Sequence, residues 1–321
     1  MLPIPVVCYL RAVRYLLVFL LALVVLPGCS NGCNKEKTGD EKMVVAVSIF
    51  PIYDLTRRIA GPDADVTLLL QPGHNEHTFD PTPKDVETVS RAKVGVMIGL
   101  GLDPWMEKLV TQAAPKATVL KVGERITTIP IKDDPVGADD HEHDEEAALE
   151  AKGARDPHVW LDPGRAKQIA DIIGKTLANA DPSHAAAYSQ RATAVAGSIS
   201  TTDTEANDRL KKLPRRDFIT FHGSFGYFAS RYHLNIDAVI EPFPGSQPTG
   251  EYVSKVLAVI KEKKVSALFS EPQLDPRPAK ILADEAKIPL GVLDPVGGNP
   301  ETDTYEKLIL FNVVQLEKLL Q

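Results

Sequence analysis

Short runs of apolar and often β-branched residues recur along the chain from residue 43 onwards. Runs of this length, separated by segments rich in Gly, Pro, Asn and Asp, predict buried β-strands. The predicted strands lie at residues 43–49, 66–70, 94–98, 118–122, 218–221, 238–240, 267–269 and 290–293. They fall into two groups of four, which indicates two sheets.

Segments with the apolar spacing of helices separate these strands. They lie at residues 52–60, 83–91, 104–113, 164–179, 249–262 and 277–286. Strands that alternate with helices at this spacing favour βαβ units and parallel sheets. We therefore expect an α/β fold with two (β/α) lobes, each built on a mainly parallel four-stranded sheet.

A long helical stretch separates the two groups of strands. It begins at Asp181-Pro182, where a capping Asp and a Pro in the first turn favour a helix start. A helix of about 30 residues would be ~45 Å long, which is more than one small lobe needs. We predict a rigid backbone helix at residues 182–213 that joins an N-terminal lobe at 43–181 to a C-terminal lobe at 214–321.

The first residues of the chain have the pattern of an export signal. Arg11 and Arg14 precede an uncharged apolar run at residues 15–28. As a helix this run would cover only ~21 Å of a bilayer core of roughly 30 Å, so we predict a signal peptide at residues 1–28. The run ends in LPGC, which resembles the lipobox of bacterial lipoproteins, with Cys29 as the lipidated residue.

The polar residues 29–42 predict a flexible tether between the lipid and the fold. We therefore expect an exported protein that its lipid anchors to the cell membrane, on the periplasmic or extracytoplasmic face.

Charge and cysteine content exclude several function classes. The chain has 36 basic and 43 acidic residues, a formal net charge of −7, and no basic cluster, which argues against nucleic acid as a partner. None of its three cysteines lies in the predicted lobes, so neither a disulfide framework nor a cysteine nucleophile is expected there. A metal site in the lobes would have to use His, Asp and Glu.

One insert, residues 132–155, lacks apolar periodicity and is rich in charge. Such a composition predicts a solvated loop. The insert also carries His141 and His143 among many carboxylates, so it is a candidate for an auxiliary site that binds zinc weakly.

Four candidate metal ligands lie at or near the ends of predicted elements. His77, His222 and Asp294 each follow a predicted strand, and His158 lies where the chain re-enters the fold after the acidic insert. In open α/β sheets, ligands bind beyond the carboxyl ends of the strands. Two of the four belong to each lobe, so we expect them to converge in the cleft between the lobes.

The segments PGHNEHTFDPTP, IGLGLDPW, DPHVWLDP, FHGSFGYF, SEPQ and LDPVGG, in this order, resemble the solute-binding proteins of zinc and manganese ABC importers. The resemblance covers essentially the whole chain beyond the leader. It implies two lobes, a connecting backbone helix and one interlobe metal site, with His77, His158, His222 and Asp294 at the family's four metal-binding positions. It also makes Glu76 an alternative oxygen ligand.

The donor set points to zinc. Three imidazoles and one carboxylate suit Zn²⁺, whereas Mn²⁺ prefers more oxygen, and in the manganese branch a carboxylate usually stands at the position of His222. Glu271, another carboxylate at a strand end, is expected to orient a ligand imidazole through its second N–H rather than to bind the metal.

The sequence thus predicts a monomeric, non-enzymatic protein that captures Zn²⁺ with high affinity and delivers it to the permease subunits of an ABC importer. The same role for Mn²⁺ or Fe²⁺ is the first alternative. A zinc-dependent hydrolase is a second, although the chain has no HExxH, GxSxG or GxGxxG motif. A surface adhesin that uses its metal only structurally is the third.

Overall fold

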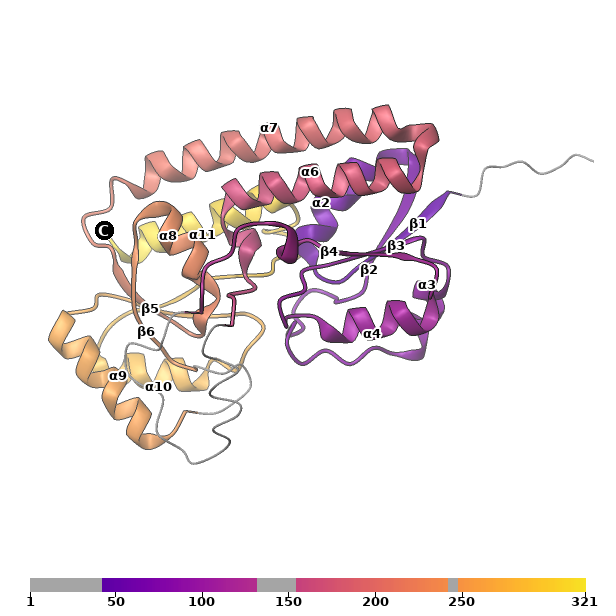
Figure 1. The fold of residues 1–321 in the computed structure, drawn as a ribbon. Coiled ribbons are helices and arrows are strands. Elements are labelled where there is room, and N and C mark those ends of the chain that lie inside the picture. Colours follow the sequence, from indigo (N-terminus) through magenta and orange to yellow (C-terminus); the bar gives the residue numbers. More distant parts are fainter. Residues whose placement is uncertain (1–41, 132–153, 242–247) are drawn as a thin grey trace, which may run out of the picture. The chain divides into compact units, whose positions relative to one another are not determined.

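Two parallel four-stranded sheets organise the structure, a computed structural model that describes residues 42–131, 154–241 and 248–321 (Figure 1). The sheet of the N-terminal lobe has the order β2-β1-β3-β4, with strands β1 (Met43–Val47), β2 (Ala64–Leu68), β3 (Val94–Met97) and β4 (Thr118–Lys121). The sheet of the C-terminal lobe has the order β6-β5-β7-β8, with strands β5 (Asp217–Thr220), β6 (Asn235–Val239), β7 (Leu268–Ser270) and β8 (Leu290–Val292). The predicted α/β fold with two parallel sheets is confirmed.

Helices connect the strands, as the spacing predicted. The helices of the first half are α2 (Phe50–Ala60), α3 (Pro83–Ser90), α4 (Pro104–Ala113) and α6 (Pro163–Ala180). Those of the second half are α8 (Gly226–Tyr232), α9 (Gly250–Lys263), α10 (Arg277–Ala286) and α11 (Tyr305–Leu319). Helices α8 and α11 were not among the predicted helices. For α11 a signal was present, because the side chain of Thr304 caps the helix by accepting a hydrogen bond from the backbone N–H of Lys307.

The long helix between the two sheets is α7 (Ala185–Leu210), which is preceded by a short 3-10 turn at Pro182–His184. Its 26 residues correspond to a length of ~39 Å. It packs against α6, α2 and α11, and so contacts helices from both halves of the chain (Figure 1). Gly174 lets α6 come close, because a Cβ atom there would lie 2.7 Å from Cβ of Ala192.

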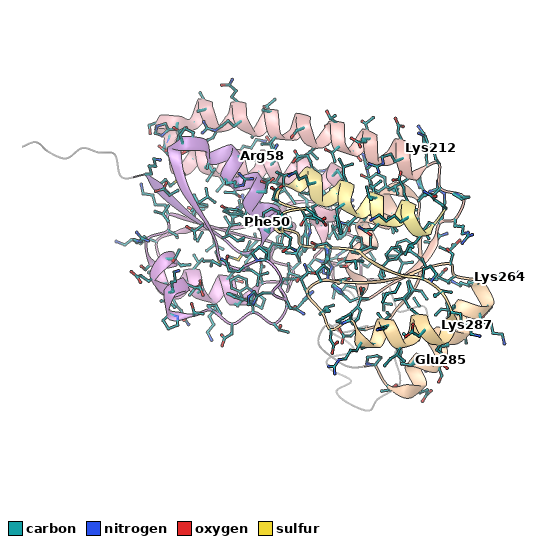
Figure 2. All side chains as sticks on the ribbon, turned by 180° about the vertical axis from the view of Figure 1, so that it is seen from behind. Phe50, Arg58, Lys212, Lys264, Glu285 and Lys287 are labelled. Atoms are coloured by element: carbon teal, nitrogen blue, oxygen red, sulfur yellow. The ribbon has the colours of Figure 1, made fainter. Side chains whose placement is uncertain are left out.

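A continuous apolar core and several polar contacts link the two lobes. The largest cluster of buried apolar side chains includes residues of both sheets, among them Val45 and Phe218. Trp160, wholly buried, donates from Nε1 to the backbone carbonyl of Pro295 at 2.7 Å, and Tyr305 donates from its hydroxyl to the carbonyl of Trp160 at 2.7 Å. On α2, Arg58, which is labelled in Figure 2, donates to the carboxylate of Glu306 on α11 at 2.8 Å.

Several predicted features lie outside the described residues. They are the signal peptide, Cys29, all of the tether except residue 42, and the part of the acidic insert that carries His141 and His143. These remain predictions. Within the part of the chain that is described, no helix combines the length and the apolar character that crossing a bilayer requires.

Candidate metal centre

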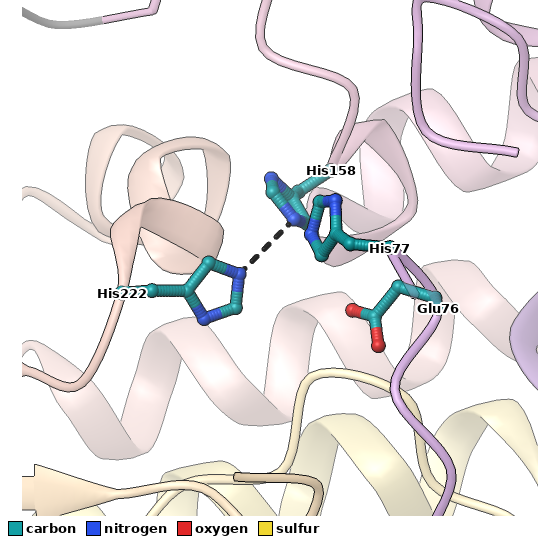
Figure 3. Close-up of side chains that lie close together, drawn as sticks. All are labelled: Glu76, His77, His158 and His222. Atoms are coloured by element: carbon teal, nitrogen blue, oxygen red, sulfur yellow. Dashed lines mark hydrogen bonds between the residues drawn. The ribbon is translucent and has the colours of Figure 1, made fainter. Parts of the chain in front are cut away.

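Four side chains from distant parts of the sequence meet in one buried cluster (Figure 3). Glu76, His77, His158 and His222 each offer one ligand atom, and these atoms all lie within 4.8 Å of one another. The imidazole rings are 5.2–5.6 Å apart between centroids. The structure therefore brings together the three histidines of the predicted set and the glutamate that was its alternative ligand.

Each member of the cluster lies in a loop next to a regular element. Glu76 and His77 lie in the loop between β2 and α3, and His222 lies two residues after β5. His158 directly precedes the 3-10 turn Val159–Leu161, which leads into α6. The ligands thus come from loops beyond the carboxyl ends of strands in both sheets and from the segment that enters α6, where open α/β folds place their binding sites.

The loop that carries Glu76 and His77 is held by side chains around it. The backbone N–H of His77 donates to the side-chain oxygen of Asn75 at 2.8 Å. Trp105 donates from its indole N–H to the backbone carbonyl of Glu76 at 3.3 Å, and its ring packs edge-on against Phe79 with centroids 4.6 Å apart. These contacts fix the backbone from which both candidate ligands project.

Carboxylates hold the far nitrogens of the other two imidazoles. Asp156 Oδ1 lies 2.8 Å from Nδ1 of His158 and also accepts the backbone N–H of that histidine at 2.9 Å. Glu271 Oε2 lies 2.9 Å from Nδ1 of His222, a close ion-pair contact without hydrogen-bond geometry, and its Oε1 accepts the Ser224 hydroxyl at 3.1 Å. A carboxylate at Nδ1 favours the tautomer whose Nε2 lone pair is free to bind a metal.

Two of the four facing atoms in the cluster lack the partners that buried polar atoms normally have, whereas the other two are within hydrogen-bond distance of each other. The Nε2 atoms of His158 and His222 are 3.4 Å apart. Glu76 Oε1 and His77 Nε2 are buried and have no hydrogen-bond partner. Because buried polar atoms are nearly always paired, unpaired acceptors that converge from several directions fit a site for a cation.

Burial and neighbouring charges shift the pKa values in the cluster in different directions. Burial, together with the two other histidines, lowers the pKa of His77 to about 3, so this imidazole stays neutral. Burial raises the pKa of Glu76. Burial disfavours the imidazolium of His222 as well, but the carboxylates of Glu271, Glu76 and Asp156 together outweigh that effect, so the pKa of His222 is raised. A proton therefore competes with a metal more strongly at His222 than at His77.

Asp294, the predicted oxygen ligand, is not part of the cluster. Its buried carboxylate accepts three hydrogen bonds at Oδ1, from the side-chain amide of Gln273 at 2.8 Å and from the backbone N–H groups of Val296 at 3.0 Å and Gly297 at 2.8 Å. A short Asp side chain often bonds the backbone two or three residues further on, and here it closes the turn after β8. The cluster thus contains Glu76 in place of the predicted Asp294, and the role of Asp294 as a ligand stays a prediction.

Comparisons to known proteins place most of the chain in one family. The family model described as zinc-uptake complex component A, periplasmic (ZnuA) matches residues 45–319. The chain belongs to this family. The resemblance inferred from the sequence motifs is therefore confirmed, and the family is one of uptake components rather than of enzymes.

Two curated relatives illustrate how far the similarity extends. The zinc-binding lipoprotein AdcA of Streptococcus pneumoniae strain R6 is 27% identical over 273 residues, which cover 85% of this chain and 54% of that protein. The chain thus spans about half the length of this relative. The high-affinity zinc uptake system protein ZnuA of Brucella abortus strain 2308 is 28% identical over 305 residues, which cover 86% of this chain and 91% of that protein.

A solved structure shares the fold. The crystal structure of ZnuA superposes with a TM-score of 0.75 at 26% identity, covering 88% of this chain and all of that one.

Proposed function

We propose that this chain captures a zinc ion outside the cytoplasm and delivers it to an ABC-type importer. The observation that carries the proposal is the buried cluster of Glu76, His77, His158 and His222, whose ligand atoms all lie within 4.8 Å of one another. The unpaired acceptor atoms of Glu76 and His77 in this cluster give a cation a direct way to satisfy them.

The donor set favours zinc among the divalent metals. Three imidazole nitrogens and one carboxylate oxygen match the compact, four-coordinate sites that Zn²⁺ forms in proteins. Mn²⁺ lies lower in the Irving–Williams order and favours more oxygen donors, so the same site would hold it more weakly. Both curated relatives described above have zinc in their names.

The same donor set argues against a hydrolase. A catalytic zinc keeps a coordination position open for water, whereas four protein ligands fill a tetrahedral site. The cluster is also buried, with only 2% of Glu76 and 3% of His222 exposed, which leaves little room for a substrate beside the metal. Transport of the ion, rather than chemistry at it, is the function that this geometry supports.

The remaining parts of the proposal concern location and partners. The leader pattern and the resemblance to a lipobox support export and anchoring through Cys29, and the relative AdcA is named a lipoprotein. The family description supports a periplasmic or extracytoplasmic site of action and, as partners, the permease subunits of an importer. We propose that the protein acts as a monomer.

Isothermal titration of the full chain with Zn²⁺ and with Mn²⁺ tests the proposal. We expect one high-affinity zinc site that is lost in His222→Ala. His74→Ala is the matched control, because this exposed histidine lies three residues from His77 in the same loop and outside the cluster. If His222→Ala binds zinc as tightly as the wild type does, the proposed site is wrong.

A further inference from the structure

The segment after strand β7 contacts both a candidate ligand and the carboxylate that is absent from the cluster. Glu271 lies against Nδ1 of His222. Two residues later, Gln273 donates from its side-chain amide to Oδ1 of Asp294 at 2.8 Å. In strand order, β7 lies between β5, which His222 follows, and β8, which Asp294 follows. One short segment therefore touches the metal centre on one side and Asp294 on the other.

The turn that carries Asp294 is linked to the centre, although Asp294 itself does not belong to the cluster. The next residue, Pro295, accepts a hydrogen bond from the indole of Trp160 at 2.7 Å. The ring of that tryptophan lies 5.4 Å from the ring of His158. The buried carboxylate of Asp294 thus lies one residue from Pro295, which bonds the tryptophan beside His158.

Hydrogen bonds to one oxygen hold this carboxylate in place. Oδ1 of Asp294 accepts the Gln273 amide and two backbone N–H groups, whereas Oδ2 has only the hydroxyl of Thr302 at 3.5 Å. The two backbone bonds belong to the same turn as Asp294 and would move with it. The bond from Gln273 comes from another strand end, so it is the contact that resists a rotation of the carboxylate.

The side chain of Gln273 is itself incompletely satisfied. Its Oε1 atom is buried and has no hydrogen-bond partner. Leaving a buried acceptor unpaired is costly, and such groups in native structures call for an explanation. An apolar residue would avoid that cost, so the amide is best explained by what its Nε2 does, which is to bind Asp294.

We propose that Gln273 sets the metal preference of the centre by keeping Asp294 out of the coordination sphere, so that Glu76 is the one carboxylate that the described residues contribute to it. This inference rests on the proposed function. A centre with three nitrogens and one carboxylate favours Zn²⁺, whereas a second carboxylate would favour a harder ion such as Mn²⁺. Gln273 acts through Asp294 and is therefore a positioning residue.

The test compares the dissociation constants of the full chain for Zn²⁺ and Mn²⁺, measured by chelator competition, in Gln273→Leu and in the wild type. We expect Gln273→Leu to shift the ratio of the two constants toward Mn²⁺ by roughly tenfold, the lower end of the effects seen when outer-shell partners of a metal site are changed. In the double variant Gln273→Leu/Asp294→Asn the ratio should return to that of the wild type. Asp294→Asn alone should leave the ratio unchanged.

The absorption spectrum of bound Co²⁺ reports the coordination of the metal. It should stay unchanged if Gln273 only stabilises the fold. Co²⁺ absorbs more strongly in four-coordinate sites than in five-coordinate ones. The Gln273→Leu spectrum should therefore lose intensity, and the double variant should regain it. Gln273→Asn, whose shorter amide cannot reach Asp294, serves as a second variant that should behave like Gln273→Leu if the leucine variant does not fold.

Two results would overturn the inference. One is an unchanged ratio in both variants of Gln273 while zinc binding persists. The other is a loss of zinc affinity of tenfold or more in Asp294→Asn, because Asp294 would then be a ligand already. Failure of the proposed function looks different, since the wild type itself would bind no zinc or would keep its affinity in His222→Ala.

Discussion

The contact between Glu271 and His222 allows a quantitative prediction for Glu271→Gln. The substitution keeps the volume of the side chain and an oxygen that can accept the Ser224 hydroxyl, but it removes the negative charge 2.9 Å from Nδ1 of His222. The side chains of His222 and Glu271 are only 4% and 1% exposed, so water does not screen the pair. Removing partners of this kind typically weakens metal binding 10- to 100-fold, and we expect Glu271→Gln to weaken zinc binding by about 1.4–2.7 kcal/mol.

The pH dependence of the same variant provides an independent check. Zinc binds the neutral imidazole, so affinity falls as the pH drops through the pKa of His222. Glu271 makes the largest contribution that raises this pKa, ahead of Glu76 and Asp156. In Glu271→Gln the fall should therefore begin at a lower pH. The affinity deficit should be largest at high pH, where His222 is neutral in both proteins, and should narrow as the wild type becomes protonated.

Zinc affinity measured by chelator competition over a range of pH values tests both effects. Glu285→Gln is the matched control, because it removes an exposed carboxylate on α10 without touching the cluster (Figure 2). An affinity within twofold of the wild type at every pH, with the same acid limit, would refute the reasoning that Glu271 holds His222 for the metal.

Two further substitutions test the supports of the centre and of the fold. Trp105→Phe keeps a ring against Phe79 but loses the N–H bond to Glu76, worth about 1 kcal/mol, so zinc affinity should drop roughly fivefold; an unchanged affinity would show that this bond does not position the loop. Gly174→Ala places a methyl group 2.7 Å from a side chain of α7 and should destabilise the fold by about 1–3 kcal/mol in urea unfolding. Gly197→Ala, on α7 where no atom lies within 4 Å of the added Cβ, should instead be neutral or stabilising. Equal effects at both sites would contradict the close approach of α6 and α7.

Much of the fold could be predicted because local sequence patterns indicate its strands and helices. Strands buried on both faces read as short β-branched runs, and the predicted and observed strands overlap at all eight positions. The exceptions have local reasons as well. Strand β6 begins at Asn235, three residues before the predicted start, because its first residues are polar or partly exposed. Helix α8 has only seven residues, too few for a periodic pattern to appear.

The candidate site could be predicted only in part. Three histidines beside strands or loop boundaries were identifiable, because chain order and topology together place such residues on one edge. Asp156, which contacts His158, was missed although an Asp two residues before a His in a DPH sequence is a local signal for such a bond. Which carboxylate joins the three histidines in the cluster could not be read from the sequence, because Asp294 is bonded by Gln273, a residue more than twenty positions away.

The hydrogen bonds between the lobes bear on how a metal ion enters and leaves. Separating the lobes would break the buried bonds of Trp160 to Pro295 and of Tyr305 to Trp160, and each group left unpaired would cost about 1–3 kcal/mol. Moving the loop that carries Glu76 and His77 would break fewer buried bonds, namely the bond from Trp105 to the backbone of this loop and the ring contact between Trp105 and Phe79. The loop movement is thus the less costly route, and we expect zinc to slow amide hydrogen exchange mainly at residues 71–82. Protection that instead appears throughout α7 and α11, with none in this loop, would indicate that the lobes open as rigid bodies.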